Sequence, residues 1–406
     1  MRNAEITYSV LALFFSGCAA PIMSVPRSST AFQTSERFSE AGLDPSLAPR
    51  IDSSIIAAIA DRATPGAAIA VGRNGHVAYL RGYGRLDWND ALPGTVDENT
   101  IYDMASLTKV IATTTAAMML EETGKLDIDR TVASYLPELT APDKVGITVR
   151  QILTHRGGFE AFAALFKTYR GREQYLQQIN ARPLASPPGT KTVYSDWDFI
   201  LLGLVIERIT GTTLDAFVAQ NIFAPLGMND TRFLPPADLK PRIAPTEIDT
   251  TRGGLVRGFV HDENAWAMGG VAGHAGLFST AHDLSIFVQM LLNGGEYNGV
   301  KLLKPATIAR WTARQSKESS RTLGWDSPSP NSSAGHYFSP RSFGHTGFTG
   351  TSIWIDPEKQ LYVILLTNRV DPTRDNQKLG PVRRAVADAV QRSAVGAPLI
   401  DWEARQ

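Results

Sequence analysis

The sequence has a single cysteine, Cys18, in 406 residues, so an intrachain disulfide cannot form. It also lacks an excess of either charge, because 40 lysines and arginines balance 40 aspartates and glutamates. A neutral chain lacks the basic surface of a nucleic-acid-binding protein, and we therefore predict no nucleic-acid partner. Hydrophobic residues make up 43% and charged residues 20% of the chain, which is typical of a globular protein. A chain of this length can bury a large core without disulfides or a structural metal.

The N-terminal region has no apolar run long enough to span a membrane, because the run Ile6–Phe15 is only ten residues long. A charged start and following small residues give it the layout of a secretory signal peptide, which we assign to residues 1–18. The segment ending in Cys18 resembles a bacterial lipobox with Phe15 where leucine is usual, so we expect Cys18 to be lipidated. An ordinary cleaved signal or a core segment are the alternatives. We predict export to the periplasm or cell envelope, membrane attachment only through this lipid, and a flexible tether over residues 19–42.

Several motifs of enzymes that bind cofactors or use other nucleophile arrangements are missing. The sequence contains no G-x-S-x-G elbow, no H-E-x-x-H zinc motif, and no glycine fingerprint for nucleotides. We therefore predict no cofactor and no metal. Of the histidines, His261 and His274 are candidates for residues that line a substrate cleft. The sequence does not indicate an oligomeric state.

Runs typical of β-strands lie near both ends of the chain, at residues 67–71, 77–80, 351–355 and 361–367. Asn74-Gly75 between the first two predicts a hairpin turn. Helical patterns prevail between the two ends. We expect an α+β fold in which one antiparallel sheet joins both ends of the chain and helices cover it, with a cleft beside an inserted part. The predicted division is a sheet domain at 43–105 plus 313–395, a mostly helical inserted domain at 106–312, and a tail at 396–406.

Ser106 and Lys109 form an S-x-x-K sequence where a helix is predicted to begin. This spacing places both side chains on one helical face, one turn apart, so the amine can reach the hydroxyl. About one such match is expected by chance at this composition, and a capping serine with a solvated lysine would explain it. However, residues 110–120 are almost all apolar or small, which predicts a buried helix. A buried lysine needs a partner or a lowered pKa.

Two further segments combine chemically useful residues with tight backbone turns. Tyr194-Ser195-Asp196 lies between a proline- and glycine-containing loop and an apolar helical run. Gly344–Gly350, with the sequence GHTGFTG, leads into the predicted strand at 351–355. Three glycines allow a backbone to approach a ligand closely. Taken singly, a packed tyrosine and a strained turn would explain both segments.

Together and in this order, the three motifs resemble those of the serine β-lactamase and penicillin-binding protein superfamily. The similar branch contains class C β-lactamases, D-alanyl-D-alanine peptidases and β-lactamase-fold esterases. The resemblance extends from about Leu43 to the final helix. It includes the runs LTHRGG at 153–158, HDENA at 261–265 and GHAGLFST at 273–280, and it implies a β-lactamase/transpeptidase-like fold.

The resemblance also implies roles for individual residues. Ser106 would be the acylated nucleophile, Lys109 its activating neighbour, and Tyr194 the general base. His345 would lie on a strand edge where lysine is usual. The backbone N–H groups of Ser106 and Phe348 would form the oxyanion hole. The substrate-binding candidates are Asp196, Thr346, Gly347, His261 and His274.

Two positions depart from the pattern of this superfamily. Asp196 replaces a frequent asparagine, and it could bond Lys109 but would repel substrate carboxylates. His345 replaces lysine, which removes a permanent positive charge. Both changes weaken the case for a β-lactamase, whose substrates contain a carboxylate. We expect an exported serine hydrolase that acts on cell-wall peptide or muropeptide amides, or on small esters, like a D-alanyl-D-alanine carboxypeptidase or an amidase. A class C-like β-lactamase and a penicillin-binding sensor without turnover are the alternatives.

Overall fold

The computed structural model describes residues 34–330 and 332–401. The predicted signal peptide and Cys18 lie outside this part of the chain. One expectation is corrected: within the predicted tether at 19–42, residues Thr34–Glu40 form helix α1. Phe38 and Ala41 are buried in the core, so this segment is anchored by apolar packing. Among the described residues, no helix is both long and apolar enough to cross a membrane.

The central sheet has five antiparallel strands and confirms the expected pairing of the two ends of the chain. Its order is β10 (Phe343–Thr346), β11 (Ser352–Asp356), β12 (Leu361–Thr367), β1 (Gly66–Arg73) and β2 (His76–Gly84). Asn74 and Gly75 form the predicted hairpin turn, and both have positive φ, at 53° and 86°. Only residues that tolerate this conformation fit there, which is why Asn-Gly predicts the turn. Strand β10 lies at one edge of the sheet.

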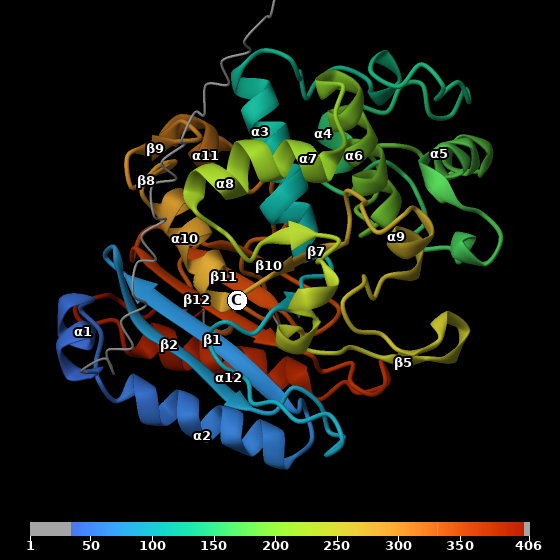
Figure 1. Cartoon of the computed structure of the whole chain (residues 1–406). Coiled ribbons are helices and arrows are strands. Elements are labelled where there is room, and N and C mark those ends of the chain that lie inside the picture. Colours follow the sequence, from blue (N-terminus) through green and yellow to red (C-terminus); the bar gives the residue numbers. More distant parts are fainter. Residues whose placement is uncertain (1–33, 331, 402–406) are drawn as a thin grey trace, which may run out of the picture. The chain divides into compact units, whose positions relative to one another are not determined.

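Helices cover both faces of the sheet (Figure 1). Helices α2 (Leu47–Ala60) and α12 (Leu379–Arg392) pack together on one face, where alternate residues of β1 and β12 share a core with them. Helix α10 (Ala281–Leu292) packs against β1 and β12 in the other core. This helix lies within the segment predicted as an inserted domain, yet it forms a layer on the sheet. The domain boundaries at 106 and 312 therefore stay predictions.

The middle of the chain is mostly helical, as expected, and also contains short strands. Its helices are the π-helical segment η1 (Lys109–Thr114), α3 (Thr115–Glu122), α4 (Val149–Leu153), α5 (Gly171–Ala181), α6 (Asp196–Thr210), α7 (Leu214–Val218), α8 (Ala224–Leu226), α9 (Glu263–Ala267) and α11 (Pro305–Thr312). Strands β3 (Tyr102–Asp103), β7 (Leu277–Ser279) and β4 (Arg232–Phe233) form a second small sheet. Segment η1 packs against α6, and all six of its residues are buried. The α+β fold is thus confirmed.

Candidate active site

Ser106 lies in a tight turn between β3 and η1. The preceding residue, Ala105, has a φ of 46°, an unfavourable conformation for a residue with a Cβ atom. Its backbone N–H donates to the buried carboxylate of Asp103 at 2.8 Å, which fixes the turn. Strain of this kind persists only where surrounding contacts hold it in place. The turn presents the Ser106 side chain at the start of the buried helical segment.

Lys109 is completely buried behind Ser106. Its Nζ atom donates to Ser106 Oγ at 3.0 Å, to Asp196 Oδ1 at 2.8 Å and to the carbonyl of His274 at 3.2 Å. Burial lowers the pKa of Lys109, but the negative charge of Asp196 and the nearby Tyr194 outweigh it, so the pKa ends above its usual value. The predicted contacts of Lys109 with Ser106 and Asp196 are therefore present, and the lysine is a protonated donor at neutral pH.

The GHAGLFST run contains His274, whose carbonyl is the third hydrogen-bond partner of Lys109, and its glycines explain how this carbonyl is placed. An added Cβ on Gly273 would collide with the Phe199 carbonyl of α6, so the glycine lets this backbone lie against that helix. The carbonyl of Gly273 accepts from Thr113 Oγ1 at 2.6 Å, beside the contact between His274 and Lys109. These bonds hold η1 and the 273–274 segment together.

Tyr194 lies immediately before α6, with its ring among two cations and two imidazoles. Lys109 Nζ is 4.9 Å from the ring centroid, and the guanidinium carbon of Arg321 is also 4.9 Å away. The rings of His155 and His345 lie at centroid distances of 4.5 and 5.8 Å. The hydroxyl of Tyr194 has no hydrogen-bond partner within the described residues. Positive charge on two sides would offset negative charge on its oxygen.

His155, from the LTHRGG run, packs its ring against the ring of Tyr194 and is uncharged. Burial, followed by the positive charges of Arg321 and Lys109, lowers its pKa well below the usual value. Its Nδ1 lies 3.2 Å from the backbone nitrogen of Ser195 and 3.2 Å from Oδ2 of the buried Asp198. His155 thus places a packed, neutral ring against the tyrosine.

His345 lies on edge strand β10, as the resemblance implied, and it too is neutral. Its Nδ1 contacts the Thr346 carbonyl at 2.8 Å, so Nδ1 holds the proton and Nε2 is left as an acceptor. Burial, followed by Arg321 and Lys109, lowers the pKa of His345 well below its usual value. His345 therefore does not replace the positive charge of the lysine that is usual there.

Arg321 is a site residue that the sequence motifs missed, and it supplies a positive charge beside Tyr194. It lies in the irregular segment between α11 and β10, where it bridges to Asp326. Asp326 in turn pairs with Gly344 through two backbone hydrogen bonds of 2.9 Å. This pairing along the β10 edge brings Arg321 close to His345. Its nearest carboxylate contact is a long one, 3.8 Å to Asp326.

The loop from Gly347 to Thr351 is pinned against the turn that precedes Ser106. Thr349 Oγ1 donates to the Asp103 carbonyl at 2.7 Å, and Thr351 Oγ1 donates to the Met104 carbonyl at 3.1 Å. An added Cβ on Gly347 would collide with the Met104 carbonyl and Thr351 Oγ1, so only glycine fits this approach. The two backbone segments predicted to supply oxyanion donors are thus held together.

These residues surround a cavity of about 730 Å³. The predicted residues that line it are Ser106, Tyr194, Asp196, His261, His345, Thr346, Gly347 and Phe348. Four arginines line it as well, namely Arg321, Arg369, Arg374 and Arg383. One expectation is corrected: His274 is buried outside the cavity lining, because its ring is turned toward Asp262 and only its carbonyl reaches Lys109.

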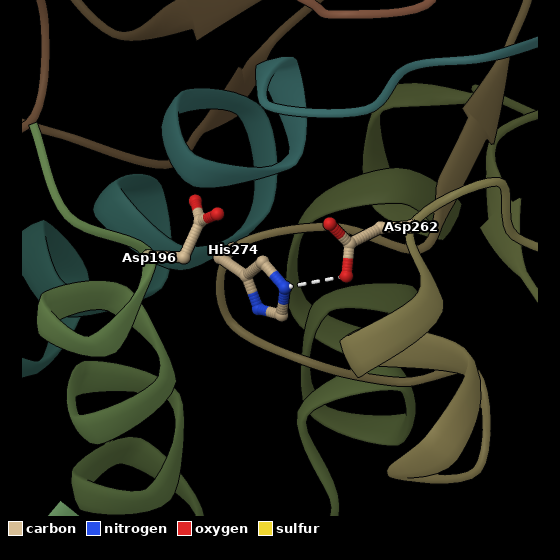
Figure 2. A group of neighbouring side chains, drawn as sticks. All are labelled: Asp196, Asp262 and His274. Carbon is tan, nitrogen blue, oxygen red and sulfur yellow. Dashed lines mark hydrogen bonds and ion pairs between the residues drawn. The ribbon is translucent and has the colours of Figure 1, made fainter. Parts of the chain in front are cut away.

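Asp196, Asp262 and His274 are close enough to hold a cation, with donor atoms within 4.8 Å of one another. Figure 2 shows the bond between His274 Nε2 and Asp262 Oδ1, which is 2.9 Å long, with Asp196 beside them. Asp262 also accepts from the N–H of Ala265 at 2.7 Å. Asp196 is already paired with the ammonium of Lys109, and Nδ1 of His274 is buried without a hydrogen-bond partner among the described residues. The absence of a metal cofactor stays a prediction.

His261 and Phe348 line the cavity side by side, with their rings stacked at a centroid distance of 5.7 Å. Its Nε2 contacts Glu247 at 2.9 Å, and Arg374 binds the same carboxylate. Burial raises the pKa of Glu247, but His261 and Arg374 outweigh it and the pKa ends well below the usual value. In this wall of the cavity, ion pairs hold Glu247, His261 and Arg374 together behind the exposed ring of Phe348.

Comparison with known sequences agrees with the motifs. Residues 51–388 match the sequence family described as Beta-lactamase. The chain is 35% identical over 381 residues to a "Putative D-alanyl-D-alanine carboxypeptidase" of Salmonella agona (strain SL483), covering 84% of this chain and 87% of the relative. A protein of the same description from Salmonella newport (strain SL254) is similar to the same extent.

Solved structures share the fold. A penicillin-binding protein homolog from Caulobacter crescentus superposes with a TM-score of 0.70 at 22% identity, covering 87% of this chain and 99% of that one. A class C β-lactamase gives a TM-score of 0.69 at 21% identity, covering 85% and 98%. EstCE1, a hydrolase with promiscuous acyltransferase activity, gives 0.70 at 22% identity, covering 85% and 98%. At such identities the likeness concerns architecture alone.

Proposed function

The chain belongs to the beta-lactamase family and is a serine hydrolase of the β-lactamase and penicillin-binding protein superfamily, and from this premise we propose that it is a D-alanyl-D-alanine carboxypeptidase acting on cell-wall peptides. The observation that supports an acyl-enzyme mechanism is the contact of Lys109 Nζ with Ser106 Oγ at 3.0 Å. The relatives at 35% identity support the choice of peptide substrate.

In the proposed acylation step, Ser106 Oγ attacks the peptide carbonyl and forms an ester with it. Lys109 cannot take the Ser106 proton at neutral pH, because its raised pKa keeps it protonated and its donors are already in use. Tyr194, in the role of general base that the resemblance implies, accepts this proton and passes it to the nitrogen of the departing amino acid. Lys109 and Arg321 offset the negative charge on Tyr194. Water then hydrolyses the ester and frees Ser106.

The oxyanion formed during attack would be stabilised by the backbone N–H groups of Ser106 and Phe348. Within the described residues, neither N–H donates to another backbone carbonyl. Ser106 and Phe348, on the pinned turn and loop, both line the cavity. Fixed donors of this kind lower the barrier because they need no rearrangement during reaction.

Arg321 offers a binding group for the C-terminal carboxylate of such a peptide. His345 is neutral, so the cation that a carboxylate requires must come from another residue. Arg321 lines the cavity beside Tyr194, and its only carboxylate contact within residues 34–330 and 332–401 is the 3.8 Å one with Asp326. A guanidinium can bind a carboxylate through two parallel hydrogen bonds. This charge also counters the repulsion expected from Asp196.

A substrate panel tests the proposal. The panel contains an N-acylated peptide ending in D-Ala-D-Ala, the same peptide with a C-terminal amide, a chromogenic cephalosporin and a p-nitrophenyl ester. We expect cleavage of the peptide acid and at least about tenfold slower cleavage of the amide, as one charged hydrogen bond is lost. Arg321→Met should slow cleavage of both peptides, because Arg321 also lies beside Tyr194, but it should slow the acid by about 10- to 100-fold more than the amide. Arg314→Met removes an exposed arginine of the same segment and serves as the matched control.

Other results would favour the alternatives. Turnover confined to the cephalosporin would indicate a class C-like β-lactamase. A stable penicillin adduct without turnover of any compound would indicate a binding sensor. Cleavage of the ester alone would indicate an esterase.

We also propose that the enzyme is exported and lipid-anchored at Cys18, where a cell-wall peptide would be accessible. The support is the charged start, short apolar run and lipobox-like end of residues 1–18. Metabolic labelling with a palmitate analogue should label the wild-type protein, and the Cys18→Ser substitution should abolish this labelling. Labelling that persists in Cys18→Ser would contradict the anchor.

A further inference from the structure

We propose that Arg383, on the C-terminal helix α12, is a positioning residue that orients and polarises the Phe348 N–H of the oxyanion hole. The inference rests on the proposed function, because it assigns Arg383 to the acyl-transfer step at Ser106. No sequence motif includes Arg383, and strands β11 and β12 lie between Phe348 and helix α12 in the chain.

The contacts of Arg383 are to the two ends of the Gly347–Thr351 loop. Its Nη2 atom donates to the Gly347 carbonyl at 2.9 Å and to the Thr351 carbonyl at 2.9 Å. The N–H of Gly347 donates to the same Thr351 carbonyl at 2.7 Å. One guanidinium therefore closes the loop from the helix side, while Thr349 pins it from the side of Ser106.

The Gly347 carbonyl and the Phe348 N–H belong to one peptide unit. In a planar trans peptide these groups point in opposite directions. Because the carbonyl is held by Arg383, the N–H must point away from Arg383, and its direction is fixed. A hydrogen bond to the carbonyl also polarises the unit and makes its N–H a stronger donor. Arg383 thus acts on the reacting oxyanion through this peptide.

The charge of Arg383 is not neutralised nearby. No carboxylate lies within ion-pair distance of Arg383 in the described part of the chain, and its Nε atom is buried without a partner. Burial and the neighbouring Arg369 lower its pKa, yet a guanidinium remains protonated at neutral pH. An unpaired, partly buried cation is costly to keep in a fold. Its location beside the cavity fits a site where negative charge develops during reaction.

The test compares Arg383→Met and Arg383→Lys with the wild-type enzyme on an ester substrate. Loss of a direct oxyanion donor lowers kcat by about 10²- to 10³-fold, so loss of its support should lower the acylation rate by about 10- to 100-fold. KM should change by less than about threefold, because the ground state does not use the oxyanion donors. Arg383→Lys should restore part of the rate, since it keeps the charge but only one of the two carbonyl contacts. Arg392→Met, on the same helix, is the control for loss of a surface cation.

A spectroscopic measurement separates this role from a structural one. The carbonyl stretch of the acyl-enzyme, recorded by isotope-edited infrared spectroscopy, reports hydrogen bonding in the oxyanion hole. We expect it to move to higher frequency in Arg383→Met, to an intermediate position in Arg383→Lys, and not to move in Arg392→Met. An unchanged band, or an unchanged acylation rate, in Arg383→Met would overturn the inference. If Arg383→Met does not fold, the same criteria apply to Arg383→Lys.

Failure of the proposed function would look different. If the wild-type protein forms no acyl-enzyme at Ser106, the proposed function fails, and the inference with it. If the wild-type acyl-enzyme forms and the Arg383 variants match it in rate and band position, only the inference fails.

Discussion

Replacing Asp196 with asparagine should reduce the free energy of unfolding by about 3 kcal/mol at neutral pH, with a loss that shrinks as pH rises. Lys109 is completely buried, and in the described part of the chain its carboxylate partner is Asp196, at 2.8 Å, whose side chain is 18% exposed. Breaking a buried pair by removing one member costs about 3–5 kcal/mol, because a charge is left without compensation. Asparagine still offers an oxygen to Lys109, so the lower end of this range applies.

The pH dependence follows from the two states of Lys109. In the wild type, burial lowers the pKa of Lys109, but Asp196 and Tyr194 raise it further, above the usual value. Its contribution to stability is then complete below the unfolded pKa, near 10.4, and is lost only at higher pH. In Asp196→Asn, the larger of the two partners that raise the pKa of Lys109 is lost, so we expect burial to prevail over Tyr194 and the folded pKa to fall below the unfolded one. The unfolded chain then binds more protons, so the stability of the variant rises with pH and approaches that of the wild type.

Urea unfolding is followed by tryptophan fluorescence at several pH values between about 6 and 9. The difference in free energy of unfolding between wild type and variant appears as a shift in the urea concentration at the unfolding midpoint, with the denaturant dependence (m) unchanged. Asp90→Asn, which alters an exposed ion pair with Arg85, is the matched control and should show little change at any pH. Equal stabilities of wild type and Asp196→Asn at neutral pH would refute the reasoning. So would a difference that stays constant across the pH range.

Three further predictions concern the surrounding turn, loop and strand. Gly347→Ala should destabilise the protein by about 1–3 kcal/mol and abolish most activity, because the added Cβ would collide with the Met104 carbonyl. Thermal unfolding measures the loss of stability and kcat/KM measures the loss of activity. A fully active variant would contradict the close approach of the two backbone segments. Ala105→Gly should raise the free energy of unfolding by up to about 1 kcal/mol, because glycine accepts the φ of 46° without strain, and urea unfolding will show whether it does. His345 should show no NMR titration of its ring between about pH 6 and pH 8, because its pKa is lowered; a midpoint near 6.5, assigned with His345→Gln, would disprove its neutral state.

Much of the fold could be predicted from local sequence patterns. The β-like runs at both ends and Asn74-Gly75 predict the hairpin and the pairing of β1 with β12. The apolar run after Lys109 correctly predicts a buried helical segment, although its π-helical geometry has no sequence signal. Helix α1 was missed because its polar composition resembles a tether, whereas the packing of Phe38 in the core anchors it.

The site residues fall into two groups, those that belong to a sequence motif and those that only tertiary contacts bring to the cavity. Ser106 and Lys109 stand in a motif whose helical spacing predicts their contact, whereas the place of Tyr194 in the site is implied by the resemblance to the superfamily. Arg321 and Arg383 depend on tertiary contacts, one through the pairing of Asp326 with Gly344 and the other through α12. No local pattern indicates such contacts. His274 was misplaced because a sequence does not distinguish a ring that faces the cavity from a backbone carbonyl that bonds Lys109.

The most direct test of the account is to trap the acyl-enzyme and locate it. After brief incubation with a penicillin or a slow ester, mass spectrometry of the intact protein and its peptides should show one adduct, attached to Ser106. Ser106→Ala should form no adduct and lose turnover of every substrate in the panel. An adduct on another residue, or turnover that survives in Ser106→Ala, would contradict the central claim that Ser106 is the nucleophile.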